Sequence, residues 1–373
     1  MNSVHKGHRP NHWLPVLTSG LINGSLVVIL QISFAALIFS GELSVHLSRG
    51  IGITLAGAFC VGLVIALTSS FRGSIACLQA SPAVVMALIA SSITARMPAS
   101  ARPEETLAAV VVAIGLTSLL TGLFFFGLGW FKVGNLVRFV PYPVSGGFLA
   151  GTGLLLVQKA MGVMTEASFS LPSLPSLLEG QVLVTWVPGV GFAVVMLAVG
   201  RRYRHYLTMP LIVALAILTF YAVLTLTGTS LNMAREQGFL LGWFPGGPLW
   251  QPADYAGLLE IDWSLILTQT AQIGTILLIT VVSLLLNASG LELIVQRDLD
   301  LNRELRATGI ANIVSGLGGS PVGYLTLSLS VLGHRLSSGS RLAGVICSGF
   351  CLLALVLGAG LLSYIPRSVI GGL

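Results

Sequence analysis

The chain has 373 residues, of which 54% are hydrophobic and only 9% carry charge, and its formal net charge is +6. A typical soluble domain carries about 25% charged residues, so this composition excludes a protein with an ordinary water-facing surface. The basic residues lie in short loops between apolar segments rather than in one block, which makes nucleic acid a poor partner. The lipid bilayer is the expected partner.

Seven apolar segments in the first part of the chain are predicted to be membrane spans. A helix needs about 20 apolar residues to cross a bilayer, and several of these segments reach that length. In chain order they are Leu17–Phe39, Gly50–Ser69, Pro82–Thr94, Leu107–Phe126, Pro143–Val157, Leu183–Val199 and Leu211–Thr227. The first is long for a signal peptide and no small-residue cleavage site stands out, so we expect it to be retained.

Four further segments follow the long loop Thr229–Asp262. They are Leu265–Leu286, Thr308–Leu317, Leu325–Leu332 and Leu342–Leu362. The stretch Glu292–Arg306 interleaves acidic and basic residues and is predicted to be a solvated loop with local ion pairs. The pattern as a whole predicts an all-α polytopic membrane protein with about eleven spans.

The distribution of arginine and lysine predicts the orientation of the chain. If the basic segment Met1–Pro10 is cytoplasmic, the loops that carry Arg72, Lys132 and the cluster at Arg201 also face the cytoplasm. Cytoplasmic loops of membrane proteins are rich in such residues. We therefore expect a multi-pass protein of the cell membrane with a cytoplasmic N-terminus.

Two of the predicted spans are too short to cross a bilayer alone, and each follows a proline or glycine interruption. Ser81-Pro82 opens the first, and Gly318–Gly323 precedes the second. Proline and glycine can simply kink ordinary helices. In transporters, however, half-helices that begin inside the bilayer direct backbone N–H groups and a positive dipole end at a central site, where an anion can be held.

The two interruptions lie in corresponding places, which predicts an inverted repeat. If the chain is divided at Asp262, each short helix is the third of its half. Residues 1–262 would then hold the cytoplasmic segment and a first repeat of about seven helices. Residues 263–373 would hold an incomplete second repeat of about four, because the stretch Tyr364–Leu373 looks like the opening of another helix. We expect a truncated chain whose last helices are missing.

At this point the sequence resembles the SulP family of inorganic anion transporters along nearly all of its length. The segments that carry the resemblance are Leu30-Gln31, Val137–Phe148 and Asn302–Leu305 with the Gly-rich run Gly309–Gly319. The resemblance implies a seven-plus-seven inverted-repeat core. It also implies a secondary active transporter of sulfate, bicarbonate, chloride or a carboxylate that works by alternating access, with Na⁺ or a proton as coupling ion, and a homodimer.

The resemblance also places a substrate site between the starts of the third and tenth helices. The positions that match the family's site are Gln31, Ser81, Ser283, Tyr324, Leu325, Thr326 and Ser328. Ser283 stands where many relatives carry Asp or Glu, and Ser328 stands where animal relatives often carry Arg. The pocket is therefore expected to be neutral, with the two helix dipoles as its main positive field. Asn287, one turn from Ser283, extends a polar stripe or packs between helices.

Other function classes stay open to different degrees. A nucleobase carrier of similar architecture would normally place acidic residues in the eighth and tenth helices, and Ser283 and Ser328 argue against it. A channel-like or sensory member with little transport cannot be separated from a carrier by sequence. An enzyme would need clustered His, Asp or Cys residues, and six scattered histidines supply none, so we predict no enzyme activity, no metal and no cofactor.

Overall fold

The computed structural model describes residues 13–98, 101–134, 179–203, 208–240, 262–337, 339–357 and 364–372, together with Leu249 and single positions between 147 and 165. Its elements, in order, are α1 (Trp13–Ile38), η1 (Gly41–His46), α2 (Leu47–Thr68), β1 (Ala76–Leu78), α3 (Ala80–Arg96), α4 (Pro103–Trp130), α7 (Gly180–Arg202), α8 (Thr208–Leu226), α9 (Leu231–Glu236), α10 (Trp263–Leu267), α11 (Thr270–Val295), α12 (Leu301–Leu317), β2 (Gly323–Leu325), α13 (Leu327–Ser337), α14 (Arg341–Leu357) and α16 (Arg367–Gly371). Most of the predicted span Pro143–Val157 lies outside the described residues.

The predicted class of helical membrane protein is confirmed. Among the described residues, five helices are long and apolar enough to cross a bilayer: Pro15–Ile38, Gly41–Thr68, Pro103–Trp130, Val182–Arg202 and Thr270–Val295. Three shorter apolar helices accompany them, Ala80–Arg96, Leu211–Leu226 and Arg341–Leu357.

The predicted solvated loop Glu292–Arg306 is wrong over most of its length. Helix α11 continues to Val295 and ends where Gln296 takes a left-handed conformation, with φ of 52°. Helix α12 begins at Leu301, because the Asp300 side chain accepts a hydrogen bond from the Arg303 N–H at 3.0 Å and so caps the first turn. Only a short connection between the two helices remains.

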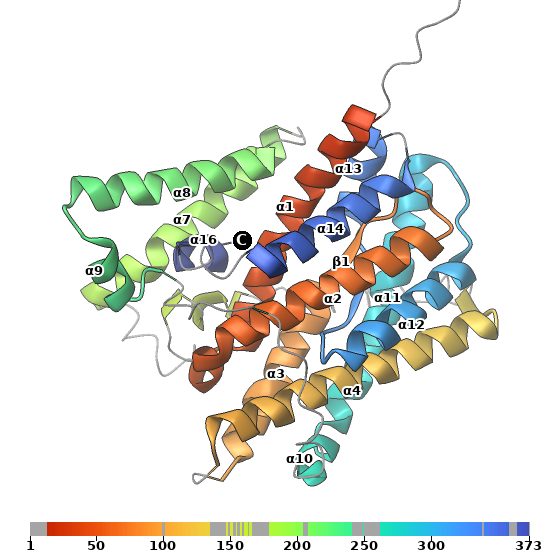
Figure 1. Cartoon of the computed structure of the whole chain (residues 1–373), viewed down its shortest axis with the longest axis horizontal. Coiled ribbons are helices and arrows are strands. Elements are labelled where there is room, and N and C mark those ends of the chain that lie inside the picture. Colours follow the sequence, from red (N-terminus) through yellow and green to blue (C-terminus); the bar gives the residue numbers. More distant parts are fainter. Residues whose placement is uncertain are drawn as a thin grey trace, which may run out of the picture.

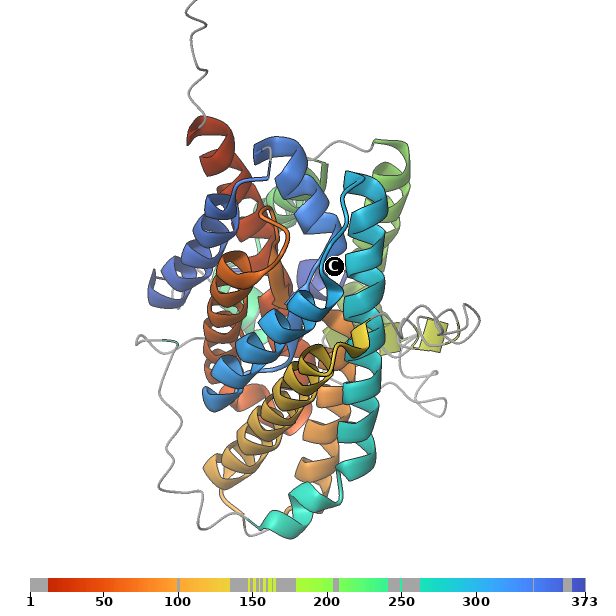
Figure 2. The same cartoon turned by 90° about the vertical axis from the view of Figure 1, so that its right-hand side faces the viewer.

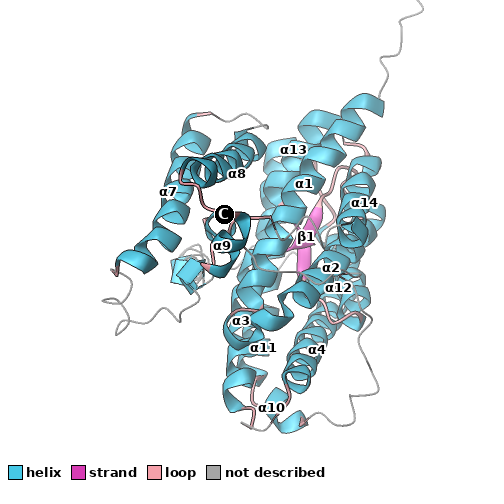
Figure 3. Ribbon diagram, turned by 60° about the vertical axis from the view of Figure 1, so that its left-hand side comes forward, coloured by secondary structure: helices cyan, strands magenta, loops and turns pink. Residues whose placement is uncertain are grey.

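The same succession of elements occurs twice. A long helix, a second helix, a strand with a short helix, and another helix appear as α1, α2, β1–α3 and α4, and again as α11, α12, β2–α13 and α14. Strand β1 pairs antiparallel with β2, with Cys77 opposite Tyr324. Antiparallel pairing is consistent with two repeats of opposite orientation. The strands were not predicted, and Figure 3 shows them enclosed by helices.

Helices α4 and α12 pack closely, and Figure 2 shows them side by side. A Cβ atom at Gly309 would lie 2.6 Å from the backbone N of Phe126, and one at Gly316 would lie 2.8 Å from the backbone N of Leu119. In lipid no hydrophobic force drives helices together, so their association depends on close packing. Small residues such as glycine permit this close approach of the two backbones. Helices α7, α8 and α16 form a second group beside this bundle (Figure 1).

Candidate functional site

The centre of the molecule is the two-stranded sheet, and side chains satisfy the strand backbone where the partner strand does not. The Asn312 carboxamide pairs with the Gly323 peptide, donating to its carbonyl at 2.7 Å and accepting from its N–H at 2.9 Å. The Ser330 hydroxyl accepts from the Ile75 N–H at 2.9 Å and donates to the Ile75 carbonyl at 3.1 Å. Non-helical backbone at this depth requires such partners, because lipid offers none.

Each strand leads directly into a helix whose N-terminus begins inside the protein. Helix α3 starts at Ala80, two residues after β1 ends, and α13 starts at Leu327, two residues after β2 ends. With 11 residues, α13 is only about 16 Å long. The first-turn N–H groups of a helix have no intrahelical acceptor, and together they carry about half a positive charge. The sheet therefore brings two partial positive charges to the middle of the fold.

Three of the predicted site residues meet there. The side chains of Ser283 on α11 and Ser81 on α3 lie near the Tyr324 hydroxyl. Tyr324 is only 2% exposed, so its ring fills the space between these two helices and β2. The family resemblance predicted that the three residues share one site, and the fold places them near one another.

Three further predicted site residues follow in β2 and at the start of α13. One is buried in the core, and two line an open pocket. Leu325 is fully buried in β2, and its backbone carbonyl accepts a hydrogen bond from Asn287 Nδ2 at 3.0 Å. Thr326 and the exposed Ser328 line a pocket of about 500 Å³ between α11 and α13. The Thr326 hydroxyl accepts a hydrogen bond from Gln79 Nε2 at 2.5 Å.

The same pocket contains two amide side chains, Gln79 and Asn287, with Ile294, Leu327 and Val331 as its apolar part. None of the described residues that line it is charged, and of the two serines behind the expectation of a neutral pocket only Ser328 lines it. Gln79 was missed by the sequence comparison. The available signal was its position directly before Ala80-Ser81-Pro82, because a polar residue at the start of a half-helix faces the same region as the helix N-terminus.

Gln31 lies apart from the pocket. It is fully buried on α1, and its Nε2 donates a long hydrogen bond of 3.5 Å to the Leu78 carbonyl at the end of β1. Its side-chain oxygen, Oε1, has no hydrogen-bond partner among the described residues. Gln31 thus contacts the strand that precedes α3 rather than lining the open pocket.

Glu304 was predicted to lie in a solvated loop, but the structure buries it. Its carboxylate is fully buried and accepts hydrogen bonds from the Ser69 hydroxyl, at 2.9 and 3.0 Å, and from the Ser70 N–H and hydroxyl, at 2.7 and 2.6 Å. The neighbouring Arg303 donates to the Thr68 carbonyl at 2.9 Å, and Arg341 donates to the Ser69 carbonyl at 2.9 Å. The hydrogen bonds of these charged side chains therefore connect the C-terminal end of α2 to α12 and α14.

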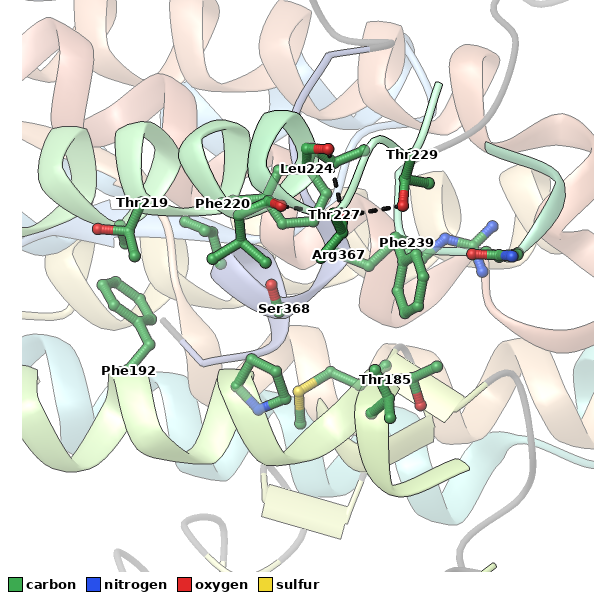
Figure 4. Close-up of a pocket in the computed structure, with 18 of the residues that line it drawn as sticks. Thr185, Phe192, Thr219, Phe220, Leu224, Thr227, Thr229, Phe239, Arg367 and Ser368 are labelled. Atoms are coloured by element: carbon green, nitrogen blue, oxygen red, sulfur yellow. Dashed lines mark hydrogen bonds between the residues drawn. The ribbon is translucent and has the colours of Figure 1, made fainter. Parts of the chain in front are cut away.

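A second pocket, of about 600 Å³, lies between α7, α8 and α16 (Figure 4). Its walls are mainly apolar, with Phe192, Phe220 and Leu224 among them, and Arg367 and Ser368 contribute polar atoms. It includes none of the predicted site residues. Among the described residues no three His, Cys, Asp or Glu side chains are grouped to hold a metal ion.

Comparison with known proteins gives a family match over nearly the whole chain. The model for the sulfate permease family matches residues 16–373. The chain is 27% identical over 279 residues to the vacuolar basic amino acid transporter VSB1 of Saccharomyces cerevisiae, which covers 72% of this chain and 27% of that protein. It is 25% identical over 326 residues to the bicarbonate transporter BicA of a Picosynechococcus species, which covers 85% of this chain and 54% of that protein.

Among solved structures, the transmembrane domain of a cyanobacterium bicarbonate transporter BicA matches with a TM-score of 0.69 and 21% sequence identity, over 97% of this chain and 86% of that one. This likeness confirms the fold class. The chain spans between about a quarter and a half of the length of the two curated relatives.

Proposed function

The chain belongs to the sulfate permease family, and from this we propose that it is a secondary active transporter of small inorganic or organic anions that works by alternating access. Sulfate, bicarbonate, chloride and small carboxylates are the candidate substrates. The transporters among its relatives support a transport role rather than an enzymatic one.

The observation that carries the proposal is the meeting of the α3 and α13 N-termini at the buried β1–β2 pair. Each helix N-terminus is equivalent to about half a positive charge, so the pair can attract an anion without a full cationic side chain.

We propose that the matched positions Gln31, Ser81, Ser283, Tyr324, Leu325, Thr326 and Ser328 form the substrate site, with Thr326 and Ser328 lining the open pocket and Gln31 and Leu325 buried at the strands behind it. Hydroxyl groups supply most of its polar atoms, and these donate hydrogen bonds to an anion without adding charge. Because Ser283 carries no carboxylate, coupling to Na⁺ or to a proton would have to use other groups, and both ions need to be tested.

We further propose that residues 1–262 form the first repeat and residues 263–373 belong to the second. Alternating access would move the bundle of α1–α4 and α11–α14 against the group of α7, α8 and α16. A location in the cell membrane, a cytoplasmic N-terminus and a homodimer are parts of the same proposal.

A second candidate is a carrier of basic amino acids. It is favoured by the likeness to VSB1, and the described residues that line the pocket add no positively charged side chain that would repel a cationic solute.

The test is uptake by the purified full chain in liposomes. Labelled sulfate, bicarbonate, chloride and lysine would be offered with and without gradients of Na⁺ or pH, beside Ser81→Ala and Thr326→Ala. Saturable anion uptake that both substitutions reduce would support the proposal. Lysine uptake without anion uptake would favour the second candidate, and nucleobase uptake or unsaturable conductance would favour a nucleobase carrier or a channel-like member.

A further inference from the structure

Besides Asn312, three amide side chains lie beside the strands that lead into the half-helices, and all three direct their nitrogen atoms at strand carbonyls. Gln31 Nε2 donates to the Leu78 carbonyl at 3.5 Å, and Asn287 Nδ2 donates to the Leu325 carbonyl at 3.0 Å. Gln79 Nε2 donates to the carbonyls of Cys77 and Tyr324 at 3.3 and 3.2 Å. The four carbonyls are the last two of β1 and the last two of β2.

These contacts fix which end of each amide faces away from the strands. The oxygen and nitrogen of a carboxamide usually have to be assigned from their partners. Here the partners are backbone carbonyls, which accept hydrogen bonds and cannot donate them. A flipped amide would place two oxygen atoms against each other, so the nitrogen must point to the strand in all three side chains.

The amide oxygens are consequently left as acceptors. Gln31 Oε1 is buried without a hydrogen-bond partner, and no donor among the described residues reaches Gln79 Oε1 or Asn287 Oδ1. Gln79 and Asn287 line the 500 Å³ pocket at the start of α13. Gln79 and Asn287 are half-buried, so water reaches their oxygens in the empty pocket. A ligand that displaces this water without supplying a hydrogen-bond donor would leave the oxygens unpaired, which is costly.

The other polar groups of the pocket are hydrogen-bond donors and therefore require an acceptor on the ligand. The first turn of α13 has unpaired N–H groups and a partial positive charge, and the hydroxyls of Thr326 and Ser328 can donate. A suitable ligand therefore carries a negatively charged oxygen for these donors and an O–H or N–H group for the amide oxygens. Sulfate, nitrate and halides have acceptors only.

We propose that the substrate is a monoanionic or zwitterionic group that carries its own hydrogen-bond donor beside a negatively charged oxygen, and that Gln79 and Asn287 determine this specificity. The inference rests on the proposed function, because it names the substrate class of the same site. Two sources share this chemistry: hydrogen carbonate, with an O–H, and an amino acid, with an ammonium group beside its carboxylate.

The experiment compares ligands that differ in the donor. Hydrogen carbonate and nitrate are both planar monoanions with three oxygens, and only the first has an O–H. Glycine and acetate share a carboxylate, and only glycine has an ammonium group. Binding of each to the purified full chain would be measured by isothermal titration calorimetry at constant pH and ionic strength.

We expect the donor-bearing member of at least one pair to bind about five- to tenfold more tightly, since one net hydrogen bond contributes that factor. A preference in the first pair identifies hydrogen carbonate as the source, and one in the second pair identifies an amino acid. Equal affinities within both pairs, a preference for nitrate and acetate, or no binding of any of the four would overturn the proposal. In the last case the amide oxygens bind water only.

Substitutions assign the specificity to the two residues. Asn287→Leu and Gln79→Met keep the side-chain size and remove the acceptor together with the donor to the strand carbonyls, so a thermal melt must first show that each variant is folded. In a folded variant the affinity ratio within the preferred pair should fall towards one. The matched control is Gln269→Met, because Gln269 is a buried amide on the N-terminal side of α11 whose Oε1 also has no partner among the described residues, outside the pocket. An unchanged ratio in both pocket variants would also overturn the assignment.

Uptake by the same preparation distinguishes a failure of the specificity proposal from a failure of the proposed transport function. If sulfate or chloride uptake is saturable while the donor-bearing ligands show no preference, the specificity proposal fails and the transport function stands. If no solute is taken up, the transport function itself fails.

Discussion

Asn312 offers the sharpest test of how the central sheet is held. Its carboxamide makes both hydrogen bonds to the Gly323 peptide and a third, at 2.8 Å, to the Thr308 carbonyl. In Asn312→Ala, the Gly323 N–H and carbonyl lose these partners in a fully buried place. At about 1–2 kcal/mol for each unpaired group, the loss is about 2–4 kcal/mol, a large part of the stability of an ordinary protein.

Asn312→Asp separates hydrogen bonding from volume, because the two side chains are nearly the same size. The aspartate keeps an acceptor for the Gly323 N–H but sets an oxygen against the carbonyls of Thr308 and Gly323, where the nitrogen now donates. We therefore expect this variant to be at least as unstable as Asn312→Ala.

The assay is thermal unfolding of the purified protein in detergent, followed by size-exclusion chromatography of heated samples. Both Asn312 variants should melt at least about 5 °C lower than the unchanged chain. The matched control is Asn232→Ala, which changes an exposed asparagine on α9 and should melt within about 1 °C of it. If Asn312→Ala melts with that control, the Asn312–Gly323 pairing does not stabilise the sheet and the reasoning is refuted.

Three further predictions concern other parts of the fold. Glu304→Ala leaves the hydroxyls and N–H of the turn after α2 without their acceptor and should destabilise by about 3–5 kcal/mol in a detergent melt; an equal effect from exposed Glu42→Ala would contradict this. Gly309→Ala places a Cβ against the backbone of α4 and should reduce the yield of folded protein, whereas Gly274→Ala, with open space around it, should be neutral or slightly stabilising. Tyr324→Phe removes the hydroxyl shared by α3 and α11, so its uptake rate should change by severalfold while its melting temperature falls by only a few degrees; unchanged uptake would place Tyr324 outside the transport path.

The spans were predictable because the bilayer sets both their length and their composition. Helices α1, α2 and α4 contain the segments predicted at Leu17–Phe39, Gly50–Ser69 and Leu107–Phe126 to within a few residues. The boundaries of α11 and α12 were missed, because the charged residues around Glu292 and Arg303 suppress the hydropathy of turns that are nonetheless helical. The Asp300 cap with Glu304 in the first turn was a local signal that hydropathy does not contain.

The sequence by itself determined that this protein is a membrane-embedded helical bundle with two interrupted helices, since composition, run length and the Pro and Gly breaks are properties of the chain alone. The family resemblance also named Ser81, Ser283 and Tyr324, which the fold places near one another. Only the tertiary structure decided that β1 pairs with β2, that Glu304 is buried, and that Gln79 faces the pocket. Each of these depends on groups separated by more than 200 residues, and no local pattern specifies which distant carbonyl or hydroxyl will satisfy a buried polar atom.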